Sequence, residues 1–271
     1  MLMKACIQVV LAFALLAGLT LSASLPAAAD TVLHVAYEDK TQFPYYMGDT
    51  QRVLDKPGAA VELVKMLEER IPGLQIRFSR YPWKRCLTML KTGQVDGIFN
   101  ASFNSSRTRI GEYPWEDGQV DPSRRLTTIS YYLYTLPNTE IGWNGEAFED
   151  PDISIGAPLG YSIVNDLENL GVSVIKVRSS MQSLQLLKAK RVKAVALQSV
   201  TADYLLANNP DQLEGIVRIA PPLKTKPYYL MLSRQFTAAH PELSEQIWDA
   251  IGELREEKLE TLARPYLSEN D

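Results

Sequence analysis

The chain has 271 residues, enough for one large domain or two small ones around a substantial hydrophobic core. Acidic and basic residues are nearly balanced, and the formal net charge is −4. The sequence contains no basic stripe, so we expect no nucleic-acid partner. It has only two histidines, and neither belongs to a cluster of ligand-type residues, so we also expect no metal ion and no cofactor.

Residues 1–29 are typical of a secretory signal peptide. Lys4 supplies a positive charge, residues 7–21 are apolar, and Ala27 to Ala29 form a small-residue cleavage site. The apolar run is short for a membrane-spanning helix, although an uncleaved anchor is the alternative. After cleavage only Cys86 would remain, so an internal disulfide would be excluded, and we expect its thiol to be buried. We therefore expect a globular protein that is exported to the periplasm.

The first segment after the leader predicts alternating strands and helices. Residues 31–37 and 74–79 alternate apolar and polar side chains and predict strands. Between them, residues 58–71 place apolar side chains on one face, as an amphipathic helix does. A polar and aromatic loop with Phe43, Tyr45 and Tyr46 precedes this helix, and Glu38 lies just past the end of the first strand. An aromatic ring with a polar tip suits a half-wet site, whereas Phe43 is better explained by packing.

The stretch from residue 81 to 115 has the strongest organisation. Pro82 can begin a helix, Trp83 starts its apolar face, and Gly93 ends it. Residues 95–99 then predict a short strand that opens into a polar loop over residues 100–109. Open α/β sheets bind ligands at the carboxyl ends of their strands, so this loop is the first candidate site.

The remaining segments predict a second lobe and a return to the first. Residues 124–135 are β-branched and aromatic and predict a strand that connects the lobes. Strands are predicted over 153–157, 172–177 and 191–197, with helices at about 163–170 and after Ser179. A short strand at 217–220, Pro221 and Pro222, and a return strand at 226–233 follow. Pro241 begins a long helix that we expect to end at Arg264 and Pro265.

The turn after the strand at 153–157 is a candidate anion site. Gly160, Tyr161 and Ser162 stand at the start of the next helix, where free backbone N–H groups and the helix dipole favour negative charge. An ordinary helix cap is the alternative for Ser162, and the two roles are compatible.

The stretch from residue 83 also carries a family resemblance. It reads W-x-R-x-L-x-x-L-x-x-G-x-V-D-G-I and is followed by S-x-x-x-x-R and Y-P, at positions Trp83, Arg85, Leu87, Leu90, Gly93, Val95, Asp96, Gly97, Ile98, Ser102, Arg107, Tyr113 and Pro114. In order and spacing it resembles the first lobe of bacterial extracellular solute-binding proteins of family 3, the type used by importers of polar amino acids.

The resemblance implies an α/β fold of the type II periplasmic-binding-protein kind, with two lobes and two hinge strands. We expect a signal peptide over 1–29, the first part of lobe 1 over 30–127, lobe 2 over 128–224, and the completion of lobe 1 with the C-terminal helix over 225–271. The implied function is capture of a small polar solute, amino-acid-like or carboxylate, for an ABC-type importer. The implied partners are this ligand and the permease in the inner membrane, and the protein is expected to be a monomer.

The resemblance also implies the ligand-binding residues. In that family an arginine at the position of Arg107 pairs with the ligand carboxylate, which a planar guanidinium can bind through two parallel N–H bonds. Ser162 would grip the same acid group from lobe 2. The other expected ligand-binding residues are Glu38, Tyr45, Trp83, Asn100, Ser102 and Gln198. Tyr46 is the alternative to Tyr45, and Trp83 suits either the site or the core beneath it.

One departure from the family concerns the position of Gln198. Amino acid binders carry an aspartate there for the ligand's ammonium group, and a neutral amide cannot balance that charge. Either another acid such as Glu38 supplies it, or the ligand lacks the ammonium group.

We predict no catalytic residues, and two alternatives stay open. Some periplasmic proteins that resemble this family are dehydratases of cyclohexadienyl acids, for which Glu38 would be the proton-transfer residue. A sensory binding module that docks on a receptor is the other alternative.

Overall fold

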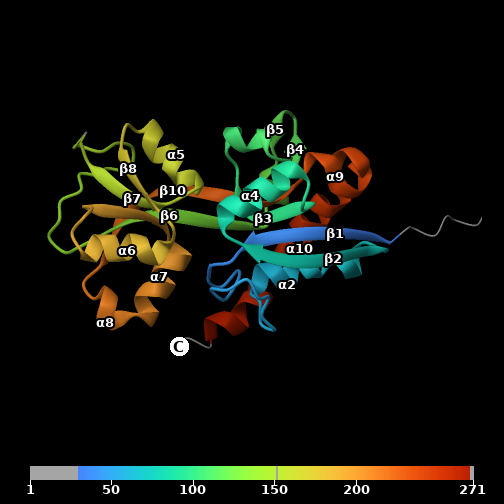
Figure 1. The fold of residues 1–271 in the computed structure, drawn as a ribbon, viewed down its shortest axis with the longest axis horizontal. Coiled ribbons are helices and arrows are strands. Elements are labelled where there is room, and N and C mark those ends of the chain that lie inside the picture. Colours follow the sequence, from blue (N-terminus) through green and yellow to red (C-terminus); the bar gives the residue numbers. More distant parts are fainter. Residues whose placement is uncertain (1–29, 151, 269–271) are drawn as a thin grey trace, which may run out of the picture. The chain divides into compact units, whose positions relative to one another are not determined.

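An eight-stranded sheet organises the chain in a computed structural model, which describes residues 30–150 and 152–268. The predicted signal peptide over 1–29 lies outside the described residues. The strand order is β2-β1-β3-β10-β6-β9-β7-β8 (Figure 1). The strands are β1 Thr31–Glu38, β2 Leu74–Tyr81, β3 Gly97–Ser102, β6 Thr127–Thr135, β7 Ser154–Pro158, β8 Ser173–Val177, β9 Ala194–Gln198 and β10 Val217–Leu232. A separate hairpin pairs β4 Trp115–Glu116 with β5 Gln119–Val120.

Helices cover the sheet and divide into two groups. Lobe 1, which holds β1–β3, contains α2 Ala59–Lys65, α3 Leu67–Arg70, α4 Trp83–Thr92, η1 Ser105–Arg109, η2 Pro122–Arg124, α9 Arg234–Ala239 and α10 Pro241–Ser268. Lobe 2, which holds β7–β9, contains α5 Ser162–Asn169, α6 Ser180–Lys188, α7 Ser199–Asn208 and α8 Pro210–Leu213. The two-lobed α/β fold predicted from the sequence is confirmed.

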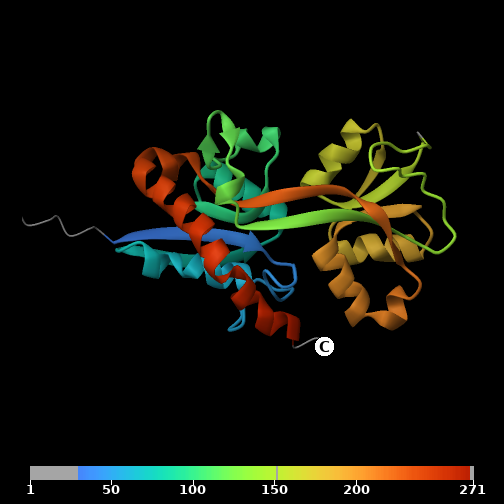
Figure 2. The same cartoon turned by 180° about the vertical axis from the view of Figure 1, so that it is seen from behind.

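Two long antiparallel strands connect the lobes. β6 and β10 pair from Val217 opposite Thr135 to Tyr228 opposite Thr127. The far end of β10 also pairs with β3, while β6 pairs with β9, so each lobe receives one edge of this ribbon. Figures 1 and 2 show the ribbon running between the two groups of strands. The predicted short strand at 217–220 and return strand at 226–233 are therefore one strand, with a break in register between Ile219 and Lys224 at the two prolines.

Each lobe buries its own core on the faces of its sheet. In lobe 1, Leu33 and Val35 of β1 pack with Leu63 of α2 and with Ile247 and Ile251 of α10. Figure 2 shows α10 lying across the lobe 1 strands. The opposite face buries Cys86 with the apolar side of α4, as the sequence predicts for this thiol. Parallel pairing of β1 with β2 and β3, and of β7 with β8 and β9, brings the carboxyl ends of these strands to one edge in each lobe.

The predicted end of α10 is wrong, because the helix continues through Pro265 to Ser268. A proline inside a helix removes one backbone hydrogen bond, so the last turn needs other contacts. Ala263 and Tyr266 pack against Ala59, and the hydroxyl of Tyr266 accepts a 2.9 Å hydrogen bond from the backbone N–H of Gly58. Tertiary packing therefore extends the helix beyond its local stop signal.

Gly58 is required by its backbone conformation and by close contact with the neighbouring loop. Its φ of 111° and ψ of 152° lie in a region that is essentially restricted to glycine. A Cβ atom there would meet the Cα of Tyr46 at 2.4 Å. We predict that Gly58→Ala lowers the free energy of unfolding by about 3 kcal/mol through backbone strain and overpacking.

Chemical denaturation of Gly58→Ala, with Gly118→Ala as the matched control, measures this effect. Gly118 also has a positive φ, 78°, but within residues 30–150 and 152–268 no atom apart from its two chain neighbours lies within 4 Å of the position that its Cβ atom would take. The control should lose only about 1 kcal/mol, the cost of the left-handed backbone. Equal losses in the two variants would contradict the role assigned to the Tyr46 contact.

Candidate functional site

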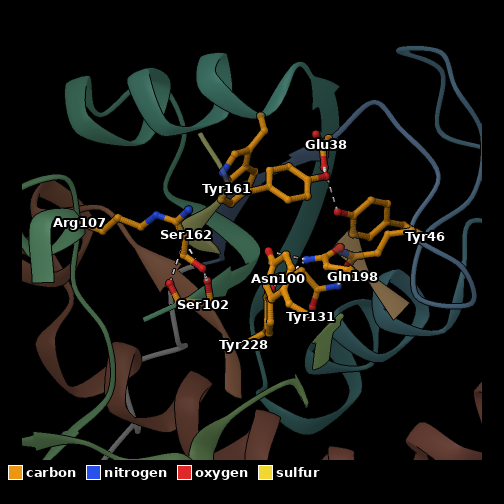
Figure 3. Close-up of a pocket in the computed structure, with 12 residues that line it drawn as sticks. Glu38, Tyr46, Asn100, Ser102, Arg107, Tyr131, Tyr161, Ser162, Gln198 and Tyr228 are labelled. Atoms are coloured by element: carbon orange, nitrogen blue, oxygen red, sulfur yellow. Dashed lines mark hydrogen bonds between the residues drawn. The ribbon is translucent and has the colours of Figure 1, made fainter. Parts of the chain in front are cut away.

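The candidate site is a small cavity between the two lobes (Figure 3). Its volume is about 10 Å³, room for about one water molecule. Strand ends from both lobes converge on it, as open α/β sheets arrange their ligand sites. The lining residues are Glu38, Gln42, Tyr46, Trp83, Asn100, Ser102, Arg107, Tyr131, Tyr161, Ser162, Gln198 and Tyr228.

Arg107 occupies one end of the cavity. It belongs to η1, and Asn104 caps the start of this short helix. The side chain of Asn104 accepts a hydrogen bond from the backbone N–H of Ser106. The Arg107 guanidinium is buried and donates at 2.8 Å to the carbonyl of Ser102 in lobe 1. It also donates at 2.9 Å to the carbonyl of Gly160 in lobe 2. One cation therefore links the two lobes.

A pair of serine hydroxyls from opposite lobes lies beside Arg107. The Oγ atoms of Ser102 and Ser162 are 2.7 Å apart, and both residues are buried. Ser162 is the first residue of α5, while Tyr161 occupies the capping position without a side-chain cap, so the alternative role of Ser162 as a helix cap is not the observed one. The Ser162 hydroxyl is free to face the other lobe.

Two aromatic contacts help to hold the lobes together. The Nε1–H of Trp83 donates at 3.3 Å to the same Gly160 carbonyl, and the Arg107 guanidinium lies 5.4 Å from the centre of the Trp83 ring. Trp83 thus both lines the cavity and packs in the lobe 1 core. Phe43 of lobe 1 stacks on Tyr204 of α7, with ring centroids 4.8 Å apart.

Glu38 is the acidic residue of the cavity lining, at the carboxyl end of β1. Its carboxylate accepts hydrogen bonds from the hydroxyls of Tyr161 of lobe 2, at 2.5 Å, and Tyr46, at 3.4 Å. Burial removes water from the carboxylate and raises the pKa of Glu38 to about 7, although the bond from Tyr161 opposes the shift. Glu38 is therefore less readily ionised at neutral pH than an ordinary glutamate.

A network of uncharged side chains forms the other end of the cavity. Asn100 donates at 2.5 Å to the side-chain oxygen of Gln42, and Gln42 in turn donates to the side-chain oxygen of Gln198. Gln198 donates to the hydroxyls of Tyr228 at 2.8 Å and Tyr131 at 3.2 Å. Asn100 has a φ of 53° at a break in the register of β3 with β10, and a bulge of this kind re-aims side chains.

The structure brings most of the predicted site residues together, with one difference. Glu38, Trp83, Asn100, Ser102, Arg107, Ser162 and Gln198 all line the cavity. Tyr45 does not line it, because its ring packs against the cores of both lobes, and Tyr46 contacts Glu38 instead. The predicted start of the polar loop at Asn100 is wrong, because β3 includes Asn100 and continues to Ser102.

Five lining residues are absent from the predicted set: Gln42, Tyr46, Tyr131, Tyr161 and Tyr228. Tyr46 is the open alternative to Tyr45, and Tyr161 stands next to Ser162 in the predicted turn. Tyr131 and Tyr228 belong to the connecting strands. In the sequence of a strand, a tyrosine that lines a cavity cannot be distinguished from one that packs in the core. Tyrosines on the strands that connect two lobes could have been predicted as site residues, because their hydroxyl groups can reach a polar cavity.

Within residues 30–150 and 152–268, no group of three His, Cys, Asp or Glu side chains is placed to hold a metal ion. No helix in this described part combines the length and the apolar character of a membrane span.

Comparisons with known proteins establish the fold. No protein-family model matches the sequence, and a search of curated proteins finds no significant match. Among solved structures, the chain is similar to an amino acid ABC transporter substrate-binding protein from Streptococcus pneumoniae bound to L-arginine. The identity is 18%, 88% of this chain and 95% of that one are covered, and the TM-score is 0.66.

Two further structures are similar over comparable lengths. A histidine kinase sensor domain with similarity to periplasmic binding proteins is 18% identical, with 87% of this chain and 96% of that one covered and a TM-score of 0.68. An ancestral amino acid-binding protein, a precursor of cyclohexadienyl dehydratase, is 15% identical, with 87% and 94% covered and a TM-score of 0.63. The chain therefore has the two-lobed fold of periplasmic binding proteins.

The raised pKa of Glu38 makes stability depend on pH. Because the folded protein holds this proton more tightly than the unfolded chain, the contribution of Glu38 to stability is fully present below pH 4.5 and is lost as the pH rises through about 7. We predict that Glu38 costs the wild-type protein about 3 kcal/mol of its free energy of unfolding between these pH values, and that Glu38→Gln does not show this decrease.

Denaturation curves at several pH values between 4.5 and 8 test this, with the exposed Glu116→Gln as control. The free energy of unfolding of Glu38→Gln should fall less steeply with pH than those of the wild type and the control. Parallel profiles for all three proteins would show that Glu38 ionises normally.

Proposed function

We propose that the protein is a periplasmic solute-binding protein that captures a small carboxylate-bearing polar solute between its lobes and delivers it to an ABC-type importer. The observation that carries this proposal is the buried guanidinium of Arg107. Its partners are backbone and hydroxyl oxygens, and no carboxylate of residues 30–150 or 152–268 forms an ion pair with it. A buried cation without an anion is costly, so a ligand carboxylate would supply the missing charge.

The contacts between the lobes suggest how binding would be coupled to closure. The cavity is too small for an organic solute, so the contacts between Ser102 and Ser162 and from Arg107 to Gly160 have to open before a ligand enters. A carboxylate could then accept hydrogen bonds from Arg107 and from both hydroxyls. Because these donors come from both lobes, the ligand would favour the closed form over the open one.

The importer and the periplasmic location follow from the same proposal. The signal-like leader favours export, and solved proteins with this fold include a substrate-binding protein of an amino acid ABC transporter. The permease in the inner membrane is the proposed partner, and the protein would act as a monomer. The proposed lobe boundaries are 30–127, 128–224 and 225–271.

We predict that Arg107→Ala lowers the affinity for carboxylate ligands about 100-fold, since hydrogen bonds to charged groups are worth roughly 1.5–3 kcal/mol each. The measurement is a thermal-shift screen against amino acids, organic acids, amines and sugars, in which ligand binding raises the unfolding midpoint. Hits are then titrated. The exposed Arg109→Ala is the matched control and should bind as the wild type does. The proposal would be contradicted if the ligands that bind are amines or sugars and they bind Arg107→Ala as tightly as the wild type.

A second candidate function is catalysis, and the state of Glu38 favours it. A carboxyl with a pKa of about 7 beside a closed cavity suits proton transfer, and an ancestral protein of this fold is a precursor of cyclohexadienyl dehydratase. Under the binding proposal, we expect the protein to leave prephenate unchanged during incubation. Turnover that Glu38→Gln abolishes would favour the enzyme instead.

A further inference from the structure

We infer that the captured solute is a small carboxylate whose second polar group is an uncharged hydroxyl or carbonyl oxygen, and that it has no ammonium group. This inference rests on the proposed function and narrows its ligand class. Donors for an anion stand at one end of the cavity, and a hydrogen-bonded network of uncharged side chains stands at the other.

The neutral end of the cavity contains no charge that could balance an ammonium group. Its members are Gln42, Asn100, Tyr131, Gln198 and Tyr228, and all are at least nine-tenths buried. Burial raises the pKa of Tyr228 to about 12 and that of Tyr131 well above its usual value, so both phenols stay neutral. An ammonium ion placed here would lose its hydration without gaining a counter-charge.

The directions of the hydrogen bonds leave a hydroxyl donor for a ligand oxygen. The side-chain oxygens of Asn100, Gln42 and Gln198 accept from Thr127, Asn100 and Gln42 respectively. The hydroxyl of Tyr131 accepts from Gln198 and, at 2.9 Å, from Tyr228. Neither contact uses the hydroxyl hydrogen of Tyr131, which is left to donate. A ligand oxygen can accept this hydrogen. An ammonium group could donate only to the second lone pairs of the amide oxygens, which supply no counter-charge.

Glu38 is a poor substitute for a dedicated ammonium partner. The same carboxylate oxygen already accepts from the hydroxyls of Tyr161 and Tyr46. Burial raises the pKa of this carboxyl to about 7, so it is less readily ionised than an ordinary glutamate. Arg107 adds a full positive charge to the same cavity, so the lining as a whole favours an anion over a zwitterion.

The anion end gains a further donor from the connecting strand β10. The buried Lys226 donates at 3.0 Å to Oγ of Ser162 and also pairs with Asp166 of α5. The bond from Lys226 uses a lone pair of Ser162, so the hydroxyl hydrogen of Ser162 remains available to Ser102 or to a ligand oxygen. Donors from Arg107, Ser162 and Tyr131 would together surround a ligand that offers only oxygen acceptors.

Titration calorimetry on matched acids tests the inference. The probes are L-amino acids together with the 2-hydroxy and 2-oxo acids of the same carbon skeletons, such as L-glutamate and 2-oxoglutarate. We expect the oxygen-bearing acid of the binding skeleton to bind the wild-type protein at least tenfold more tightly than its amino counterpart. Gln198→Asp should reverse this order, because it places a carboxylate in the neutral network. The exposed Gln212→Asp, with the same change in charge, should keep the wild-type order.

The possible results distinguish failure of this inference from failure of the proposed function. If an amino acid binds the wild type more tightly than its oxo and hydroxy counterparts and needs Arg107, the inference is overturned and the proposed function stands. If no acid of either kind binds, both are overturned. The wild-type comparison decides the inference even if Gln198→Asp fails to fold, and Gln198→Glu offers a second way to introduce the charge.

Discussion

The buried guanidinium of Arg107 is the interaction on which the two-lobed arrangement depends. It joins the carbonyls of Ser102 and Gly160, which belong to different lobes, at the point where two serine hydroxyls also meet. A cation removed from water needs compensation, and carbonyl dipoles supply only part of it. The closed cavity therefore has an unmet demand for negative charge, and we interpret that demand as the basis of ligand capture.

The fold keeps this cation and its neighbours in place through rigid elements. Strands β6 and β10 carry Tyr131, Tyr228 and Lys226 into the interface, so the connection between the lobes also forms the floor of the site. Arg80 at the end of β2 is almost fully buried and donates to the carbonyls of Glu38, at 3.1 Å, and Gly48, at 2.6 Å. It fastens the loop that supplies Gln42 and Tyr46 against β1. A charged side chain thus performs a structural task beside the functional one.

Much of the site could be predicted from the sequence because it follows the ends of strands. Glu38, Ser102 and Gln198 each stand at the carboxyl end of a strand, and periodicity alone locates those ends to within a few residues. The choice between Tyr45 and Tyr46 could not be predicted, since it depends on tertiary packing, which places Tyr45 against the two cores and the hydroxyl of Tyr46 beside Glu38.

The other differences have tertiary causes. The continuity of β10 across two prolines comes from its pairing with β6, and the passage of α10 through Pro265 comes from packing on Ala59. Local breaker residues mark both places as ends, and contacts from distant parts of the chain override them. Tyr131 and Tyr228 could not be predicted as site residues for a related reason. A buried tyrosine on a strand has the same sequence pattern whether its hydroxyl meets the core or a ligand.

A crystal structure of the protein with the carboxylate that gives the largest thermal shift would test the central claim most directly. We predict that the ligand's carboxylate lies between the lobes, within hydrogen-bond distance of Arg107 and of at least one of the hydroxyls of Ser102 and Ser162. A carboxylate bound elsewhere, with Arg107 still joined to Gly160 across an empty interface, would contradict it.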